Sequence, residues 1–238
     1  MKSTYKPTDK ANNHKPSVLC ISATDPMGMS GLQADMRALA AMNVHGLMCI
    51  TATTSQNQNG FYALNPVSLD AFKSQLDAVH QQNVCSVIKI GLLANEQQVQ
   101  CLLHHEIIKN KKIVLDPVLS ATAGEIELHQ ERLRALQILL PFCSLVTPNL
   151  DEAKQLIGST EKEPHCLAHD FLALGVAAVL IKGGHGIHPS RDLYAQRDVQ
   201  FYLEHNIYSH SSHRGTGCIM ASLIAGALAL GSTTGDAV

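Results

Sequence analysis

The chain has 238 residues, of which 45% are hydrophobic and 16% are charged, and its formal net charge is -2. This balance is typical of a globular protein with a sizeable core, and the lack of a concentrated basic field argues against a dedicated nucleic-acid-binding surface. Seven single cysteines without a Cys-x-x-Cys pair indicate reduced thiols in a cytoplasmic protein and not a disulfide framework.

The two ends of the chain carry further expectations about its organisation. Residues 1–16 are polar and contain no apolar segment, so we expect a flexible leader and not a secretory signal. Residues 218–230 form the longest apolar stretch, which is too short to span a bilayer. We therefore expect no membrane partner and one domain over residues 17–238.

Short apolar runs bounded by turn residues recur along this domain, and helical periodicity follows them. The predicted helices cover 31–42 and 69–82, and the segment that follows residue 51 is polar and rich in Gln and Asn. The predicted strands cover 17–22, 46–51, 86–90, 112–116, 144–147 and 177–182. Apolar strands alternating with helices indicate a doubly wound α/β domain with a parallel sheet covered on both faces. Ligands of such sheets lie at the carboxyl ends of the strands.

A glycine motif precedes the last predicted helix. Arg-Gly-Thr-Gly-Cys at 214–218 leads directly into the apolar segment 219–230. Glycines at a helix start let backbone N–H groups converge where the helix dipole is positive, which stabilises a phosphoryl group in transfer. At this position we expect the pKa of Cys218 to fall below its free value of about 8.5. The alternative is a tight loop before a core helix, with Cys218 as a small hydrophobic residue.

Seven segments, in this order, carry a family resemblance. They are 23–26 with 31–35 (Ala-Thr-Asp-Pro and Gly-Leu-Gln-Ala-Asp), 51–57 (Thr-Ala-Thr-Thr-Ser-Gln-Asn), 89–92 (Lys-Ile-Gly-Leu), 115–118 (Leu-Asp-Pro-Val), 147–153 (Thr-Pro-Asn-Leu-Asp-Glu-Ala), 181–185 (Ile-Lys-Gly-Gly-His) and 215–218 (Gly-Thr-Gly-Cys). From about Ser17 to its end, the chain resembles the hydroxymethylpyrimidine and phosphomethylpyrimidine kinases of the ribokinase-like superfamily. Cys218 stands where most ribokinase-like enzymes carry an aspartate, and this cysteine resembles the pyrimidine kinases in particular.

The resemblance implies a fold and an activity. The fold is a three-layer αβα sandwich with a central, mostly parallel sheet. The activity is ATP-dependent phosphorylation of the hydroxymethylpyrimidine of thiamine biosynthesis, of its monophosphate, or of both, with Mg²⁺ and in a homodimer. Two rivals stay open, namely a pyridoxal or pyridoxine kinase and a non-catalytic pyrimidine sensor built on the kinase fold.

The resemblance also implies roles for the substrate and the catalytic residues. Gln56 is expected to recognise the ring nitrogen and amino group of the pyrimidine through its paired donor and acceptor. Asp35 and Val118 are expected to line the same pocket. The amides of Gly215, Thr216 and Gly217 are expected to form the anion hole, with Cys218 as the catalytic residue. The simpler alternatives are that Gln56 lies in a solvated turn and that Asp35 is an acid on a helix face.

Further implied roles concern the metal and the nucleotide. Asp116 and Glu152 are expected to hold Mg²⁺, directly or through water, and Asn149 to help place the metal and the phosphates. Lys182 is expected near the nucleotide phosphates. Simpler readings are a strand-end turn residue for Asp116, a strand-end charge for Lys182, and a capping pair for Asn149 and Glu152, whose spacing fits a helix start.

The chain departs from the family pattern at three places. Met29 replaces a glycine and would be strained if this position required a positive φ. Arg214 stands where a histidine is common, and an arginine there is suited to bidentate contact with a phosphate. Residues 235–238 resemble the start of a helix that relatives continue, so we expect a shortened terminal helix.

Overall fold

The computed structural model describes residues 15–119, 130–160, 163–183, 191–206 and 215–238. The expected leader, except for its last two residues, lies outside these ranges. Within them, the strands of the main sheet are, in spatial order, β10 (Val199–Glu204), β9 (Arg191–Gln196), β8 (Ala178–Ile181), β7 (Leu145–Val146), β6 (Lys112–Leu115), β5 (Val87–Ile90), β1 (Ser17–Ser22) and β2 (His45–Ile50). Neighbouring strands pair in parallel from β2 to β8, whereas β9 runs antiparallel to both β8 and β10.

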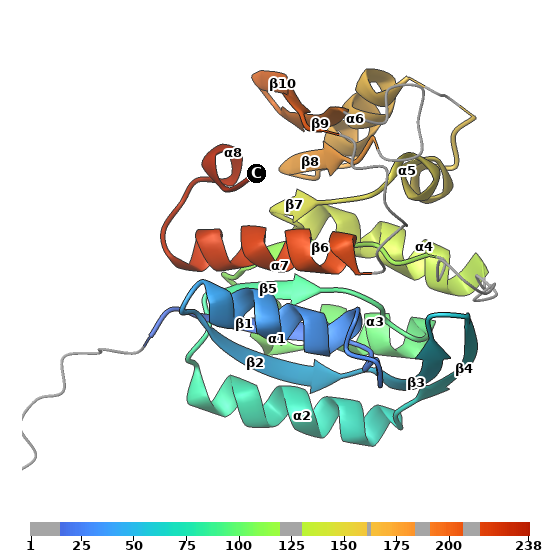
Figure 1. Cartoon of the computed structure of the whole chain (residues 1–238), viewed down its shortest axis with the longest axis vertical. Coiled ribbons are helices and arrows are strands. Elements are labelled where there is room, and N and C mark those ends of the chain that lie inside the picture. Colours follow the sequence, from blue (N-terminus) through green and yellow to red (C-terminus); the bar gives the residue numbers. More distant parts are fainter. Residues whose placement is uncertain (1–14, 120–129, 161–162, 184–190, 207–214) are drawn as a thin grey trace, which may run out of the picture.

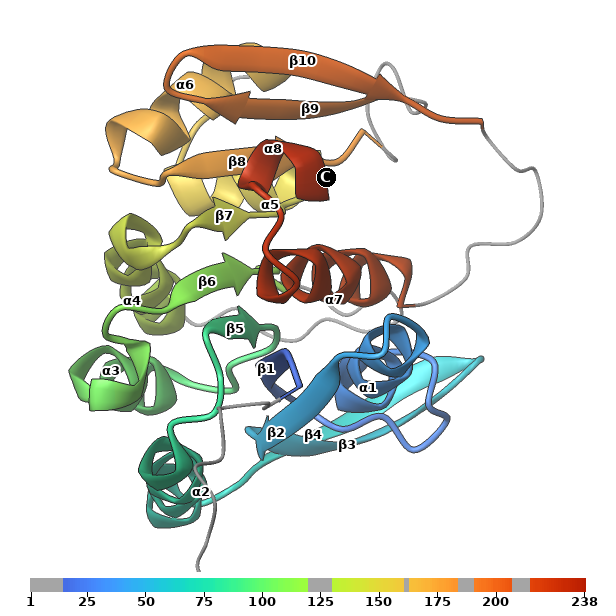
Figure 2. The ribbon, with the colours of Figure 1, turned by 90° about the vertical axis from the view of Figure 1, so that its left-hand side faces the viewer.

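Helices cover both faces of this sheet, and Figure 2 shows α2, α3 and α4 on one side and α1 and α7 on the other. The helices are α1 (Gly31–Ala41), α2 (Leu69–Gln82), α3 (Glu96–His104), α4 (Gln130–Leu139), α5 (Leu150–Ile157), α6 (Pro164–Ala173), α7 (Thr216–Ala229) and α8 (Thr234–Ala237), with short 3₁₀ turns at Glu106–Ile108 and Leu140–Phe142. None of the described helices combines the length and the apolar character that crossing a membrane requires.

The alternation of side chains along β1 explains the two helical layers. Leu19 and Ile21 pack into the core under α2 to α6, whereas Val18 and Cys20 pack into the core under α1 and α7. All four side chains are fully buried. Successive residues of a strand point to opposite faces, so a strand buried on both faces is apolar throughout. The prediction of a parallel sheet covered on both sides is confirmed.

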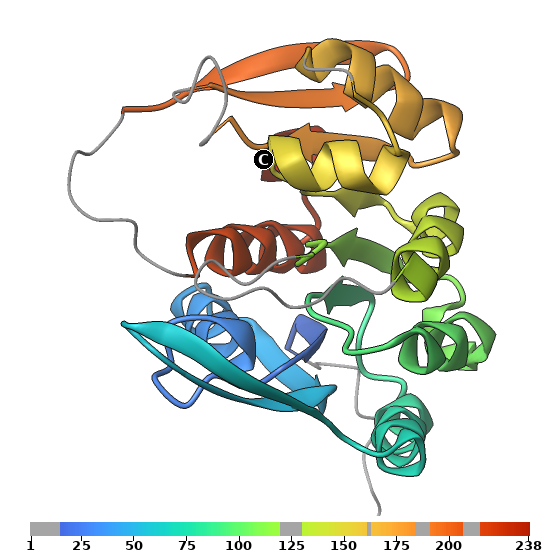
Figure 3. The same cartoon turned by 90° about the vertical axis from the view of Figure 1, so that its right-hand side faces the viewer.

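A second sheet consists of the hairpin formed by β3 (Ala52–Asn57) and β4 (Gly60–Pro66). From its sequence this region reads only as polar, because its buried face consists of small and hydroxyl side chains: Ala52 and Thr54 are buried, whereas Thr53 and Ser55 are exposed. In Figure 1 the hairpin lies on the side to which β2 and β5 point and at which α7 begins. Figure 3 shows it next to α1, on the α1 and α7 side of the sheet.

Candidate active site

The first glycine of α7 packs directly against the loop before α1. Gly215 is the N-cap of α7 and has a φ of 85°, in the left-handed region. A Cβ on this residue would lie 1.9 Å from the carbonyl oxygen of Met29, so only glycine fits here. Gly28 and Gly31 have positive φ angles, and Met29 is not among the described residues with a positive φ. The methionine in place of the family's glycine is therefore not strained.

Asp25 shapes this loop from inside. Its carboxylate accepts hydrogen bonds from the backbone N–H groups of Met27, Met29 and Ser30 at 2.8 to 3.1 Å, and from the hydroxyl of Ser30 at 2.9 Å. Asp25 is 1% exposed. It therefore fixes the backbone that faces Gly215.

Cys218 lies in the first turn of α7 and faces charged groups. Lys89, Asp116 and Asp35 are close enough to its sulfur to influence the charge of the thiol. Burial raises the pKa of Cys218 to about 11, and although Lys89 acts in the opposite direction, Asp116 and Asp35 add to the rise. The expectation of a lowered pKa is thus wrong, because desolvation of the thiolate outweighs the favourable charges around it.

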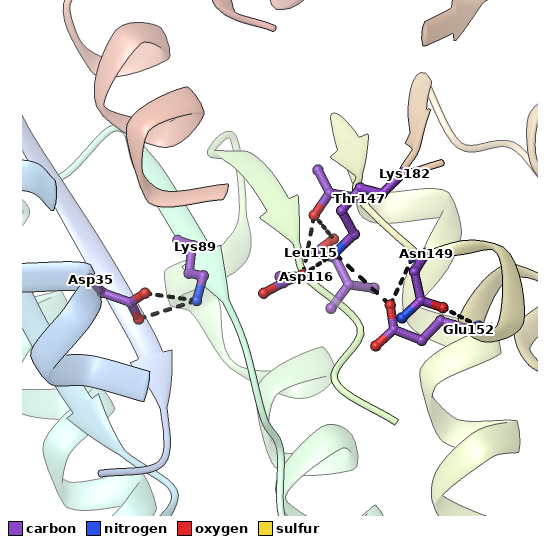
Figure 4. Close-up of polar contacts among 8 residues, drawn as sticks. All are labelled: Asp35, Lys89, Leu115, Asp116, Thr147, Asn149, Glu152 and Lys182. Carbon is purple, nitrogen blue, oxygen red and sulfur yellow. Dashed lines mark hydrogen bonds and ion pairs between the residues drawn. The ribbon is translucent and has the colours of Figure 1, made fainter. Parts of the chain in front are cut away.

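Asp116 and Lys182 meet beside Gly217. The ammonium of Lys182 lies 3.1 Å from Oδ1 of Asp116, and the hydroxyl of Thr147 also approaches that oxygen, at 3.4 Å (Figure 4). Burial alone would raise the pKa of Asp116, but Lys182 and Lys89 hold it below its usual value. A Cβ on Gly217 would lie 3.2 Å from the Lys182 ammonium and 3.8 and 3.9 Å from the Asp116 oxygens. The missing side chain leaves this space free next to a cation.

Glu152 approaches the same ammonium from α5. Its Oε2 lies 4.0 Å from Nζ of Lys182 and accepts a hydrogen bond from the N–H of Asn149 at 2.8 Å. In return, Oδ1 of Asn149 accepts from the N–H of Glu152, which completes a capping box. Burial raises the pKa of Glu152 to about 7, although Lys182 opposes the shift.

Asp35, expected to line the substrate pocket, lies in the protein interior. Its side chain is fully buried in this structure. Its two oxygens accept from the Lys89 ammonium at 3.0 and 3.1 Å (Figure 4). Oδ1 also accepts from the hydroxyl of Ser222 at 2.8 Å. A buried carboxylate needs such partners, and here they satisfy it within the protein.

Gln56 and Val118 belong to the region around the hairpin. Gln56 follows a shift in the β3–β4 register and is half-buried, with its amide nitrogen 2.9 Å from Oγ1 of Thr54. Val118 packs on a small apolar cluster that includes Ala23 and Ala52, at the base of the hairpin. Both residues therefore lie at the edge of the sheet where α7 begins.

A short series of contacts connects Gln56 to Cys218. The hydroxyl of Thr54, which binds Gln56, donates to the carbonyl of Thr24 at 2.7 Å. Thr24 lies against Gly31, where an added Cβ would be 3.6 Å from the Thr24 carbonyl carbon. Met29 and Ser30, just before Gly31, pack against Gly215, three residues before Cys218. The two predicted site residues thus share one side of the molecule.

Three residues of the site were missed as functional candidates, namely Asp25, Lys89 and Ser222. Lys89 offered a signal, because a lysine in the apolar strand Val87–Ile90 must be buried with a counter-charge. Asp25 and Ser222 offered none, since an acid in a loop and a serine in a helix are common. Arg214 lies outside the described residues.

The carboxylates of this site suit a hard cation. Among the described residues, no three His, Cys, Asp or Glu side chains form a metal-binding group. Mg²⁺, however, is commonly held by one or two carboxylates together with substrate phosphates and water. Asp116 and Glu152, with the free space at Gly217, fit that pattern.

The chain is similar to proteins of known activity along most of its length. The family described as "Phosphomethylpyrimidine kinase" matches residues 25–238. The hydroxymethylpyrimidine/phosphomethylpyrimidine kinase of Rhizobium meliloti (strain 1021) is 34% identical over 226 residues, which are 92% of this chain and 85% of the relative.

Two solved structures have the same fold. The phosphomethylpyrimidine kinase of Clostridium difficile 630 superposes with a TM-score of 0.81 at 28% identity, covering 93% of this chain and 94% of the other. The pyridoxal kinase of Staphylococcus aureus in complex with ADP superposes with a TM-score of 0.83 at 26% identity, covering 93% and 83%. The predicted ribokinase-like sandwich with a mostly parallel sheet is confirmed.

Proposed function

Because the chain belongs to the phosphomethylpyrimidine kinase family, we propose that it transfers the γ-phosphoryl group of ATP to the hydroxymethyl group of hydroxymethylpyrimidine, and in a second cycle to the monophosphate, in thiamine biosynthesis. One observation carries the proposal at the level of residues: Cys218, Asp116 and Lys182 converge beside the glycines at the start of α7. Backbone donors, a cation and a proposed base around one point would support transfer of a phosphoryl group.

The transfer follows from these groups. The hydroxymethyl oxygen forms a bond to the γ-phosphorus while the bond from that phosphorus to the ADP oxygen breaks. The amides of Gly215, Thr216 and Gly217 stabilise the charge on the phosphoryl oxygens, and Lys182 lies beside the same space. The proton of the alcohol passes to the thiolate of Cys218. Because the pKa of Cys218 is high, its thiolate is a strong base but is present in only a small fraction of the molecules at neutral pH. Positioning of the reactants therefore provides most of the rate acceleration.

Asp116 and Glu152 would hold the Mg²⁺ ion that accompanies ATP. When bound, the cation neutralises charge on the phosphates. Asn149 orients Glu152 through the capping box and so supports the same site. Titration with EDTA should abolish turnover, and added Mg²⁺ should restore it. Full turnover in the presence of EDTA would exclude the metal.

An ATP-coupled assay on hydroxymethylpyrimidine and on its monophosphate tests the function. We expect Cys218→Ala to lower kcat about a hundredfold or more while the KM for ATP stays within about twofold. Cys218→Ser, which keeps a smaller proton acceptor, should retain part of the activity. A Cys218→Ala variant with parent-like kcat would refute the catalytic role.

The pyridoxal alternative rests on the likeness to the Staphylococcus aureus pyridoxal kinase. Turnover of pyridoxal and of hydroxymethylpyrimidine, measured side by side, decides between the two substrates. We expect kcat/KM to favour the pyrimidine, because Gln56 offers a paired donor and acceptor. Binding of the pyrimidine without consumption of ATP would identify a sensor.

We further propose that residues 17–238 act as one kinase domain and that the protein is a cytoplasmic homodimer, as the family resemblance implies. Within the described residues, Cys20, Cys49, Cys85, Cys101, Cys143 and Cys218 are free thiols, which is compatible with a reducing compartment. Light scattering coupled to size-exclusion chromatography measures the dimer, and a monomeric mass at micromolar concentration would reject it.

A further inference from the structure

The amide group of Gln56 is held by a relay of two hydrogen bonds. Oγ1 of Thr54 lies 2.7 Å from the carbonyl oxygen of Thr24, and Nε2 of Gln56 lies 2.9 Å from that same Oγ1. Thr54 is 9% exposed. Water therefore competes little for its hydroxyl, and the relay is largely sealed within the protein.

The chemistry of the relay determines its direction. A carbonyl oxygen only accepts, so the single hydroxyl hydrogen of Thr54 is donated to Thr24. The Thr54 oxygen can then only accept, and the group that faces it must be the NH₂ of Gln56. A flipped amide would bring two acceptors together. The relay thus leaves Gln56 with its Oε1 acceptor and one N–H donor for a ligand.

The backbone around Gln56 supports this arrangement. Thr54 and Gln56 are two residues apart on β3 and so share a face of the hairpin. The extra residue at the nearby register shift, Tyr62, lies on β4, because Ser55 pairs with Ala63 and Gln56 pairs with Phe61. The hairpin is also tied to Thr24 through the backbone, because the N–H of Thr24 donates to the carbonyl of Ala52 at 3.0 Å. The reference point of the relay is therefore rigid.

We propose that Thr54 is a positioning residue that fixes the amide of Gln56 in the one orientation that matches an aminopyrimidine. This inference rests on the proposed contact between Gln56 and the substrate. An aminopyrimidine presents a ring-nitrogen acceptor beside an amino donor, and a glutamine amide pairs with both. A hydroxypyridine such as pyridoxal lacks the amino donor, so it gains less from the fixed amide.

The test compares two substitutions at residue 54. Thr54→Val keeps the shape of the side chain and removes the hydroxyl, and we expect kcat/KM for hydroxymethylpyrimidine to fall about tenfold. The KM for ATP should stay unchanged, and kcat/KM for pyridoxal should change less than about twofold. Thr54→Ser keeps the hydroxyl and should restore kcat/KM for the pyrimidine to within about twofold of the parent value. Thr53→Val, on the exposed face of the same strand, is the matched control and should behave as the parent.

A double-mutant cycle separates the relay from a general structural effect. If Thr54 acts through Gln56, Thr54→Val should have no further effect in a Gln56→Ala background. Equal losses of Thr54→Val in both backgrounds, or equal losses for both substrates, would overturn the relay. Parent-like kcat/KM for Thr54→Val would overturn it as well. If Gln56→Ala itself has parent-like kcat/KM, the Gln56 contact fails and the relay fails with it, while turnover of the parent enzyme still tests the proposed function.

Discussion

The ammonium of Lys89 lies 3.0 and 3.1 Å from the two carboxylate oxygens of Asp35, and both side chains are fully buried. Ser222 donates to the same carboxylate, so Asp35 on α1, Lys89 on β5 and Ser222 on α7 connect these three elements near the start of α7. Burial would lower the pKa of Lys89, but Asp35 raises it above its ordinary value. Lys89 is therefore charged at neutral pH.

Removing one partner of this pair should destabilise the protein strongly. Asp35→Leu leaves the Lys89 charge buried without a partner, and we expect the free energy of unfolding to fall by about 3 to 5 kcal/mol. Asp35→Leu combined with Lys89→Met removes both charges and should recover most of this loss. Urea denaturation measures both values. A double variant no more stable than the single one would show that the cost lies in packing and not in the unpaired charge.

The two glycines before Cys218 should respond differently to alanine. In Gly215→Ala the new Cβ meets the Met29 carbonyl in a left-handed backbone, so we expect the melting temperature to fall and kcat to drop about a hundredfold or more. In Gly217→Ala the new Cβ is close only to the flexible end of Lys182, at 3.2 Å, and is in ordinary contact with the Asp116 oxygens, and alanine favours a helix by about 1 kcal/mol. Stability should therefore hold while kcat/KM for ATP falls. Parent-like activity in Gly217→Ala would mean that phosphate does not use this space.

The raised pKa of Cys218 predicts slow alkylation in the ligand-free, metal-free protein. With a pKa of about 11, the thiolate is a small minority at pH 8, and its fraction rises about tenfold per pH unit from pH 7 to 10. Mass spectrometry of the peptide that carries Cys218, after iodoacetamide treatment, follows this rise. The same peptide in urea is the control and should level off near pH 9. A plateau below pH 8 in the folded protein would instead support the lowered pKa expected from the helix start.

Asp25 should matter through the loop that it shapes. Asp25→Ala removes the acceptor of three backbone N–H groups between residues 27 and 30, and we expect a loss of about 2 to 4 kcal/mol in the free energy of unfolding. Because this loop packs on Gly215, kcat should fall as well. Asp70→Ala, an acid in the first turn of α2, is the control and should cost less than about 1 kcal/mol. A folded Asp25→Ala variant with parent-like kcat would show that the loop does not contribute to the function of the anion hole.

Much of the fold was predictable because its signals are local. The strands β1, β5, β6 and β8 lie within one residue of their predicted bounds, since each is an apolar run of a length that suits a buried parallel strand. The hairpin of β3 and β4 was missed, because Thr and Ser side chains on its two faces do not give an apolar alternation. The antiparallel edge formed by β9 and β10 also depends on pairing that no local pattern indicates.

The sequence by itself determined the residue types of the site and their order after the strands, because glycines before a helix and acids after strands are local patterns. Only the tertiary structure decided which of these side chains are in contact with one another. Asp35 and Ser222 are 187 positions apart, and their hydrogen bond, like the ion pair of Asp35 with Lys89, arises from the packing of α1 and α7 on the sheet. The pKa of Cys218 was likewise decided by packing, since burial depends on neighbours from distant parts of the chain and outweighs the local field of the helix start.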